Sequence, residues 1–374
     1  MASDMTPTVT TSTKTLIDPP FSSDYLASRT RFRAAAEAAG FALQAYGIGH
    51  KGPRGEDLTL DVAVRGAANP ARVVIVSSGT HGIEGFYGAA VQTAALEGEL
   101  GAGWEPPADT RVVFIHAINP YGFAHIRRVN EDNIDLNRNF VKSSGKYAGA
   151  PEDYARLDDL LNPQSAPTAL DPFLAKAGVQ LAKHGFNALK NAIAQGQYEF
   201  PRGLFFGGKG PSKSLTLLAE LLPPLVGSAK RVVHLDFHTG MGKWGTYVLA
   251  VDFPNDSERV RRLRREFGHE AVQGLDPSGV LYEINGSLGG WLQDQFPEVE
   301  YDCMLAEYGT HNVIEVLSAM REENRAHHHC APGSAAHQKA KQRFKEAFFP
   351  ESRAWQTSAV RDSLKIVRQA LAAR

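Results

Sequence analysis

Two histidines and a glutamate stand where strands of a sheet are expected to end. His81 and Glu84 follow the apolar run Arg72–Ser78, and His238 follows the apolar run Arg231–Phe237. Ligands of open α/β sheets gather at the carboxyl ends of strands, so these three side chains are expected to converge. Two histidines, one carboxylate and an open position for water are typical of a hydrolytic zinc site. The sequence therefore predicts one Zn²⁺ per chain, held by these residues.

A second glutamate ends another predicted strand. Glu307 follows the short apolar run Cys303–Ala306. From that position it can accept a proton from water and pass it to a leaving amine, as general base and acid. Considered alone, it is explained equally well as a solvent-facing carboxylate at the edge of the sheet.

The segment after the apolar run Arg111–Ile118 is dense in amides and guanidinium groups. Arginine offers a planar fork of donors that matches a carboxylate, and asparagine adds a neutral donor. Asn137 and Arg138 therefore predict a site for a substrate carboxylate. Arg128 is predicted to polarise the scissile carbonyl and to stabilise the oxyanion. Solvated or capping side chains remain the alternative for any single arginine of this segment.

Other histidines are expected to be structural. His234 lies deeper in the same predicted strand as His238 and is expected to be a packed core histidine, and the same is expected of His116 and His125. The run His327–Cys330 contains good ligands for soft metals, but adjacent residues point in different directions, so they do not converge on one ion. The glycine-rich segments lack the order that phosphate binding requires, and no G-x-S-x-G elbow of a serine hydrolase is present.

The elements that must position these residues alternate between strands and helices, which predicts an α/β fold. We expect one domain, residues 21–374, built on a mixed, mostly parallel twisted sheet with helices on both faces. Residues 1–20 are expected to be a flexible tail. The segment at about 142–206 breaks the alternation and is predicted to be an insertion or lid. The predicted helices are Tyr25–Ala39, Gly85–Leu100, Leu174–Ile193, Ser257–Val272, Ser287–Gln295, Ala336–Phe348 and Ala359–Ala373, and the remaining strands are Leu58–Val64 and Tyr247–Phe253.

The composition disfavours nucleic acid and membranes as partners. The 374 residues include 40 basic and 41 acidic side chains, so no overall field favours nucleic acid or an anionic membrane. Two cysteines are too few for a disulfide framework, and neither a secretory signal nor a long apolar span is visible. We therefore expect a cytoplasmic protein with a small-molecule substrate, and an oligomer is possible.

Together these residues resemble the zinc carboxypeptidase (carboxypeptidase A-like) superfamily, which includes aspartoacylase and succinylglutamate desuccinylase. The likeness covers roughly residues 72–310 and is greatest to an uncharacterised bacterial branch. It is carried by H-G-x-E-G at His81–Gly85, D-L-N-R-N at Asp135–Asn139, His238 at a strand end, A-E-Y at Ala306–Tyr308 and the Tyr282–Trp291 loop.

The resemblance implies the same three zinc ligands, with Glu307 as general base and acid. It implies Arg128 as carbonyl polariser, with Arg127 left open as an alternative. It further implies that Asn137, Arg138 and Tyr282 bind the terminal carboxylate, and that Asp135 fixes the tautomer of His81.

The expected function is that of a zinc-dependent metallocarboxypeptidase that acts on a small peptide or an N-acyl amino acid. One alternative is an N-acyl amino-acid deacylase or esterase of the aspartoacylase type. Another is a non-catalytic module that binds a carboxylate. The spacing from Glu84 to His238 is longer than is usual in the superfamily, because of the segment after Phe140, and this leaves the substrate open.

Overall fold

The apolar runs of the chain form one sheet. A computed structural model describes residues 20–168, 171–276 and 285–373. Within them, eight strands pair in the order β1-β2-β4-β3-β5-β8-β6-β7. The strands are β1 (Ala42–Lys51), β2 (Asp57–Gly66), β3 (Arg72–Ser78), β4 (Thr110–His116), β5 (Arg231–Thr239), β6 (Tyr247–Pro254), β7 (Val272–Leu275) and β8 (Glu300–Tyr308).

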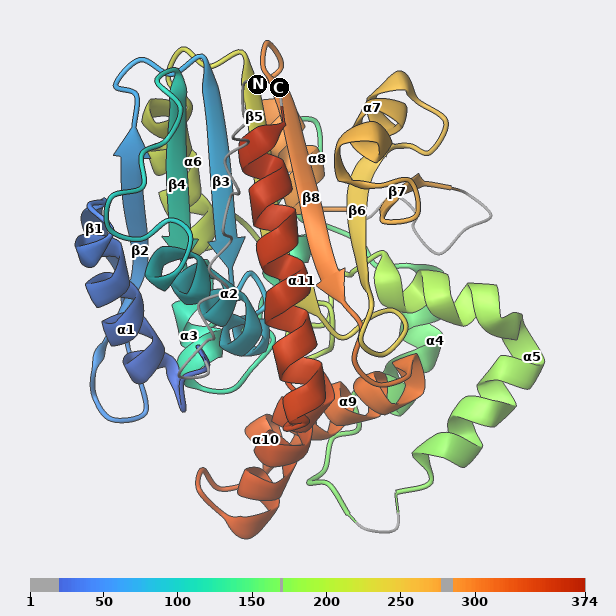
Figure 1. Ribbon diagram of the computed structural model, residues 1–374. Coiled ribbons are helices and arrows are strands. Elements are labelled where there is room, and N and C mark those ends of the chain that lie inside the picture. The colour runs from blue at the N-terminus through green and yellow to red at the C-terminus, as the bar shows by residue number, and fades with distance from the viewer. Residues whose placement is uncertain (1–19, 169–170, 277–284, 374) are drawn as a thin grey trace, which may run out of the picture.

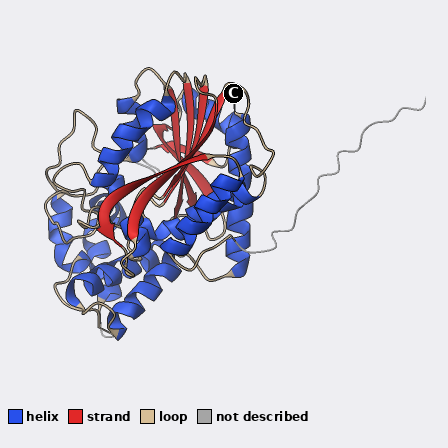
Figure 2. Cartoon of the chain, turned by 90° about the vertical axis from the view of Figure 1, so that its left-hand side faces the viewer, coloured by secondary structure: helices blue, strands red, loops and turns tan. Residues whose placement is uncertain are grey.

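The centre of the sheet is parallel. β4, β3, β5 and β8 run in one direction, whereas β1, β2 and β6 join through antiparallel pairs. Strands β3 and β5 are buried along nearly their whole length, as their unbroken apolar runs predict. The twist of the sheet is visible in the side view (Figure 2). The predicted mixed, mostly parallel sheet is confirmed.

Helices cover both faces of the sheet. In Figure 1, α1, α2 and α11 lie on the near side, and α6 and α8 lie behind. The helices are α1 (Tyr25–Ala38), α2 (Gly85–Glu97), α3 (Pro120–Ala124), α4 (Glu152–Leu161), α5 (Phe173–Ala194), α6 (Lys213–Val226), α7 (Glu258–Phe267), α8 (Leu288–Gln295), α9 (Val313–His329), α10 (Ala335–Phe348) and α11 (Arg353–Ala372), with short 3-10 turns η1 (Gly82–Glu84) and η2 (Leu136–Arg138).

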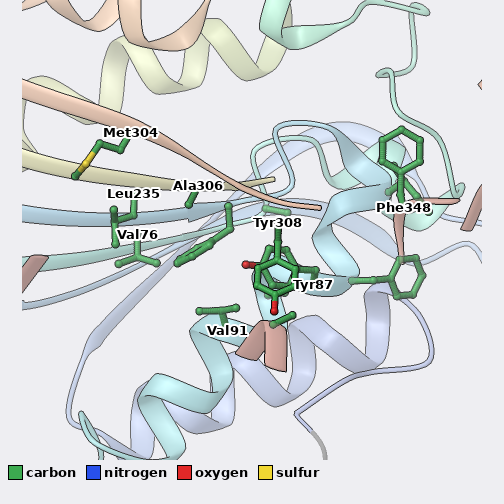
Figure 3. Close-up of a cluster of buried hydrophobic side chains, with 14 of the residues drawn as sticks. Val76, Tyr87, Val91, Leu235, Met304, Ala306, Tyr308 and Phe348 are labelled. Carbon is green, nitrogen blue, oxygen red and sulfur yellow. The ribbon is translucent and has the colours of Figure 1, made fainter. Parts of the chain in front are cut away.

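Two hydrophobic cores lie on the two faces. On the near face, side chains of β3, β5 and β8 pack against α2, and Figure 3 labels Val76, Leu235 and Ala306 opposite Tyr87 and Val91. The other core joins the opposite face of these strands to α6 and α8. Side chains alternate between the two faces along a strand. Near the end of each strand, one residue therefore packs in a core while the next can present a polar group on the other face.

The segment predicted as an insertion contributes α4 and α5 and no strand of the sheet among its described residues. Both helices lie beyond the edge of the sheet (Figure 1). Arg321 and Arg325 of α9 hold the segment in place, because both bond the carboxylate of Asp171 and Arg325 also bonds the carbonyl of Ser165 at 2.9 Å. The segment is therefore attached to the body through partly buried charge pairs.

Several elements differ from prediction. Helix α7 ends at Phe267 rather than Val272, because Gly268 takes a φ of 109° that ends the helix, and β7 follows. Helix α11 begins at Arg353, six residues earlier than predicted. Strands β1 and β7 and helices α3, α4, α6 and α9 were not predicted. No helix in the described part of the chain is long and apolar enough to cross a membrane.

Candidate metal centre

The three predicted ligands meet at the carboxyl ends of β3 and β5. His81 and Glu84 lie on the turn between β3 and α2, and His238 is the last residue but one of β5. All three are buried. The Nδ1 atoms of the two histidines are 3.3 Å apart, and the Glu84 oxygens lie 3.0 Å from His81 Nδ1 and 2.8 Å from His238 Nδ1.

These spacings fit a metal ion. Each residue offers one ligand atom, and the three atoms lie within 4.8 Å of one another. Ligands that surround zinc at 2.0–2.1 Å with tetrahedral angles lie about 3.3 Å apart. Two imidazole nitrogens and one carboxylate oxygen also match the donors that zinc prefers in catalytic sites. The residues present therefore fit a Zn²⁺ ion.

Each histidine is backed by a carboxylate on its far side. His81 Nε2 lies 3.1 Å from Asp135 Oδ1, and His238 Nε2 lies 2.5 Å from Asp236 Oδ2. A carboxylate at Nε2 keeps the proton on that nitrogen and leaves Nδ1 to bind metal. Burial lowers the pKa of His238, but Asp236 and Glu84 outweigh burial and hold this pKa well above its usual value.

Asp236 itself is fixed by two hydroxyl groups. It is fully buried and accepts hydrogen bonds from Ser77 at 2.6 Å and Thr80 at 2.8 Å. Sequence reasoning missed this residue. A signal was present, because Asp236 stands two places before His238 in a strand and therefore shares its face.

Arg128 is directed into the cluster, whereas Arg127 is directed away. Arg128 Nε donates to Asp135 Oδ2 at 2.9 Å, and its Nη1 atom donates to Glu84 Oε1 at 3.5 Å. Arg127 is buried and instead bonds Glu323 and Asn324 of α9. The loop that carries both arginines packs against the turn that carries His81 and Glu84, since Gly82 N donates to the Arg128 carbonyl at 3.1 Å.

That packing depends on the absence of a side chain at Gly82. A Cβ atom there would lie 2.1 Å from the backbone of Gly122. Glycine in the H-G-x-E-G pattern therefore lets two backbone segments approach closely, and this approach sets the distance between Arg128 and the ligands.

Glu307 stands beside His238. The two residues are partners on the parallel strands β8 and β5, so their side chains share a face. Burial raises the pKa of Glu307, His238 and Arg128 oppose this effect, and Glu84 and Asp236 add to it. Its Oε2 atom is buried and has no hydrogen-bond partner among the described residues.

The predicted carboxylate-binding residues follow Asp135 directly. Asn137 and Arg138 lie on η2 and are buried. Asn137 Oδ1 accepts a bond from the backbone of Leu288 at 3.0 Å, which ties this turn to α8. Tyr282 lies outside the described residues.

The remaining histidines serve the core or the surface. His234 is buried between Ser77 and the Tyr301 hydroxyl, and burial lowers its pKa to about 4. His116 is buried and bonds Ser28. In the described residues the group at His81 is the one cluster of histidine, cysteine and acidic side chains close enough to share an ion, so the run His327–Cys330 forms no such cluster.

Comparison with known families shows to which family the chain belongs. The model of the family described as "Protein of unknown function (DUF2817)" matches residues 21–362. The chain belongs to this family. No curated protein matches this DUF2817 member.

Comparison with solved structures finds similar chains. The bovine thrombin-activatable fibrinolysis inhibitor, in complex with tick carboxypeptidase inhibitor, is 12% identical with a TM-score of 0.50, and the match covers 94% of this chain and 96% of that chain. The murein-tripeptide amidase MpaA from Escherichia coli O157 is 19% identical with a TM-score of 0.39, over 78% of this chain and 95% of that one. The first likeness confirms the predicted zinc carboxypeptidase-like fold, and at this identity it shows the fold alone.

Proposed function

We propose that this protein is a zinc-dependent hydrolase that cleaves an amide bond next to a carboxylate, as a metallocarboxypeptidase acting on peptides or N-acyl amino acids. The observation that carries the proposal is the convergence of His81, Glu84 and His238 within 4.8 Å. Structural zinc sites fill all four positions with protein groups, whereas three ligands of this kind are typical of catalytic sites. When bound, Zn²⁺ supplies Lewis acidity that lowers the pKa of water and polarises a carbonyl.

Glu307 serves as the proton carrier. Its buried Oε2 atom has no partner in the described part of the chain, so it can accept a hydrogen bond from water. It takes one proton as the water oxygen attacks the carbonyl carbon. It then gives that proton to the amine nitrogen as the carbon–nitrogen bond breaks.

Arg128 stabilises the charge that develops on the carbonyl oxygen. Asp135 fixes its Nε atom, which orients the guanidinium before substrate arrives. A donor held in place in this way loses little energy to reorganisation when the oxyanion forms. Burial lowers the pKa of Arg128, but Asp135 and Glu84 outweigh burial and raise it, so the group stays charged.

Arg138 and Asn137 bind the carboxylate of the substrate. Arg138 is buried, and a carboxylate paired with a buried guanidinium gains a strong charge-assisted bond. We assign Tyr282 to the same task on the resemblance alone.

The test is hydrolysis by zinc-loaded protein. Blocked dipeptides with a free carboxyl terminus and N-acyl amino acids form the two substrate panels, with products identified by mass spectrometry. Glu307→Gln is the matched control, because it keeps the shape of the side chain and removes the base. We expect it to keep one zinc and to lose about 10²- to 10⁴-fold in turnover.

The outcomes separate the alternatives. Preference for dipeptides supports a carboxypeptidase, and preference for N-acyl amino acids supports a deacylase of the aspartoacylase type. Retained turnover in Glu307→Gln contradicts the role of this residue. Absence of hydrolysis in both panels, with zinc bound, contradicts the enzyme and supports a module that binds a carboxylate.

A further inference from the structure

An aromatic ring from the segment beyond α5 lies against both arginines of the candidate site. The guanidinium carbon of Arg128 is 5.9 Å from the centroid of the Phe205 ring, and that of Arg138 is 5.8 Å from the same centroid. Arginine within about 6 Å of an aromatic face is attracted by the negative charge of the ring face. One ring therefore contacts the two cations to which we assign different parts of the substrate.

We propose that Phe205 is a positioning residue that sets the distance between Arg128 and Arg138. This inference rests on the proposed function, in which one arginine meets the scissile carbonyl and the other meets the carboxylate. Two like charges placed close together repel each other. An aromatic ring that attracts both can hold them at a fixed separation, and that separation selects substrates in which the amide and the carboxylate are adjacent.

The backbone of Phe205 supports a dedicated role. Its φ of 58° lies in the left-handed region, which is uncommon for a bulky residue and persists only when the surroundings enforce it. The surroundings do so here. Gln197 N donates to the Phe205 carbonyl at 3.1 Å, and Asp135 N donates to the Phe206 carbonyl at 2.7 Å. The backbone next to Phe205 is thus bonded to the same Asp135 whose carboxylate bonds Arg128.

The same segment also contacts the backbone and stem of Arg138. The Tyr198 hydroxyl donates to the Arg138 carbonyl at 2.8 Å. Gly196 lies so close that a Cβ atom would approach Arg138 Cδ to 2.5 Å. Residues 196–205 therefore pack against Arg138, although they are far from this arginine in sequence.

The position of each arginine can be measured without a substrate. Phenylglyoxal modifies arginine, and peptide mass spectrometry reports the rate at Arg128 and at Arg138 separately. Phe205→Leu removes the ring and enlarges the small cavity that Phe205 lines beside Arg128. We expect modification of both arginines to accelerate about fivefold or more when this attraction is lost. Phe205→Tyr keeps the ring face and should restore the slow rate.

Two further variants control for folding. Phe206→Leu is the matched control, since Phe206 is a buried neighbour that packs in the core with α6 and α8. It should leave the rates at both arginines unchanged. Where Phe205→Leu fails to fold, Phe205→Asn replaces it, because asparagine tolerates a positive φ and has no ring. Zinc content and circular dichroism are measured for every variant.

Binding of benzoylglycine, which carries an amide next to a carboxylate, is the second readout. Benzoylglycine is itself an N-acyl amino acid, so its binding is measured by calorimetry on zinc-loaded Glu307→Gln, in which turnover is lost. Adding Phe205→Leu should raise the dissociation constant about tenfold. Faster arginine modification without any binding of benzoylglycine by Glu307→Gln supports the positioning role and contradicts the proposed function. Unchanged modification in a folded ring-free variant overturns the inference, as does equal binding of benzoylglycine by Glu307→Gln with and without Phe205→Leu.

Discussion

Replacement of Asp236 by asparagine should weaken zinc binding without removing a ligand. Asp236 Oδ2 lies 2.5 Å from His238 Nε2, while Ser77 and Thr80 donate to the same carboxylate. The carboxylate accepts all three donors. An asparagine has one oxygen, so its amide nitrogen must face either a hydroxyl group or the imidazole. When it faces the imidazole, the ring proton moves to Nδ1, the atom that faces Glu84 and the metal position.

The expected loss follows from this competition. Removal of a carboxylate behind a metal-bound histidine typically costs about 10- to 100-fold in metal affinity. This range corresponds to about 1.4–2.7 kcal/mol of binding free energy. We place Asp236→Asn within the range rather than below it, because burial prevents water from replacing the lost acceptor.

The assay is competition for zinc against a chromogenic chelator at pH 7. Asp61→Asn is the matched control: Asp61 is equally buried, but it pairs with Arg33 at 2.6 Å and not with a ligand. It should lower stability and leave the zinc dissociation constant unchanged. An unchanged constant in folded Asp236→Asn would refute the tautomer argument.

Three further predictions follow from the same contacts. Arg128→Gln should reduce turnover about 10²- to 10³-fold. Arg127→Gln should mainly lower stability, by about 1–3 kcal/mol, because Glu323 loses one buried partner and keeps Lys341. Denaturation and steady-state kinetics together check both, and equal turnover losses would refute the assignment. Burial lowers the pKa of His116 from 6.5 to about 4. The buried neutral imidazole therefore contributes to stability above pH 6.5. This contribution, about 2–3 kcal/mol, is lost as the pH falls toward 4. His116→Gln should therefore lose less stability than the wild type between pH 7 and 4.5 in urea titrations, and identical losses would contradict this. Zinc removal by a chelator should lower the melting temperature, since free zinc at about 1,000 times its dissociation constant adds about 4 kcal/mol of stability. An unchanged melting temperature in calorimetry would argue against zinc binding to the folded state.

Local sequence patterns were sufficient to predict the turn that carries His81 and Glu84 and the central strands of the sheet. His81 and Glu84 are three residues apart on one turn, and the runs that form β3 and β5 are apolar throughout because both faces are buried. Helix α9 has no such pattern. Its buried residues include Arg321, Glu323 and Arg325, which are paired with charges from distant segments, so the helix does not show an apolar stripe.

Edge strands were missed for a different reason. In β1, only Ile48 is buried, and two glycines interrupt the strand, so neither alternation nor an apolar run is visible. The role of Phe205 left no local signal at all. Its two arginines stand 77 and 67 residues earlier in the chain, and only the folded molecule brings the ring to them.

The balance of charge around His81, Glu84 and His238 indicates that protons and a divalent cation would compete for this site. Four buried or half-buried carboxylates stand against two arginines, and without metal two protons make up the difference. Burial lowers the pKa of His238, but Asp236 and Glu84 hold it well above its usual value, and burial raises the pKa of Glu307. The carboxylates and arginines are Glu84, Asp135, Asp236, Glu307, Arg128 and Arg138. Uncompensated charge in a protein interior is costly, so such a group persists only where protons or a cation balance it. A divalent ion bound by Glu84 and the two histidines would supply the same charge as these two protons, so it could displace them and leave Glu307 ionised as a base.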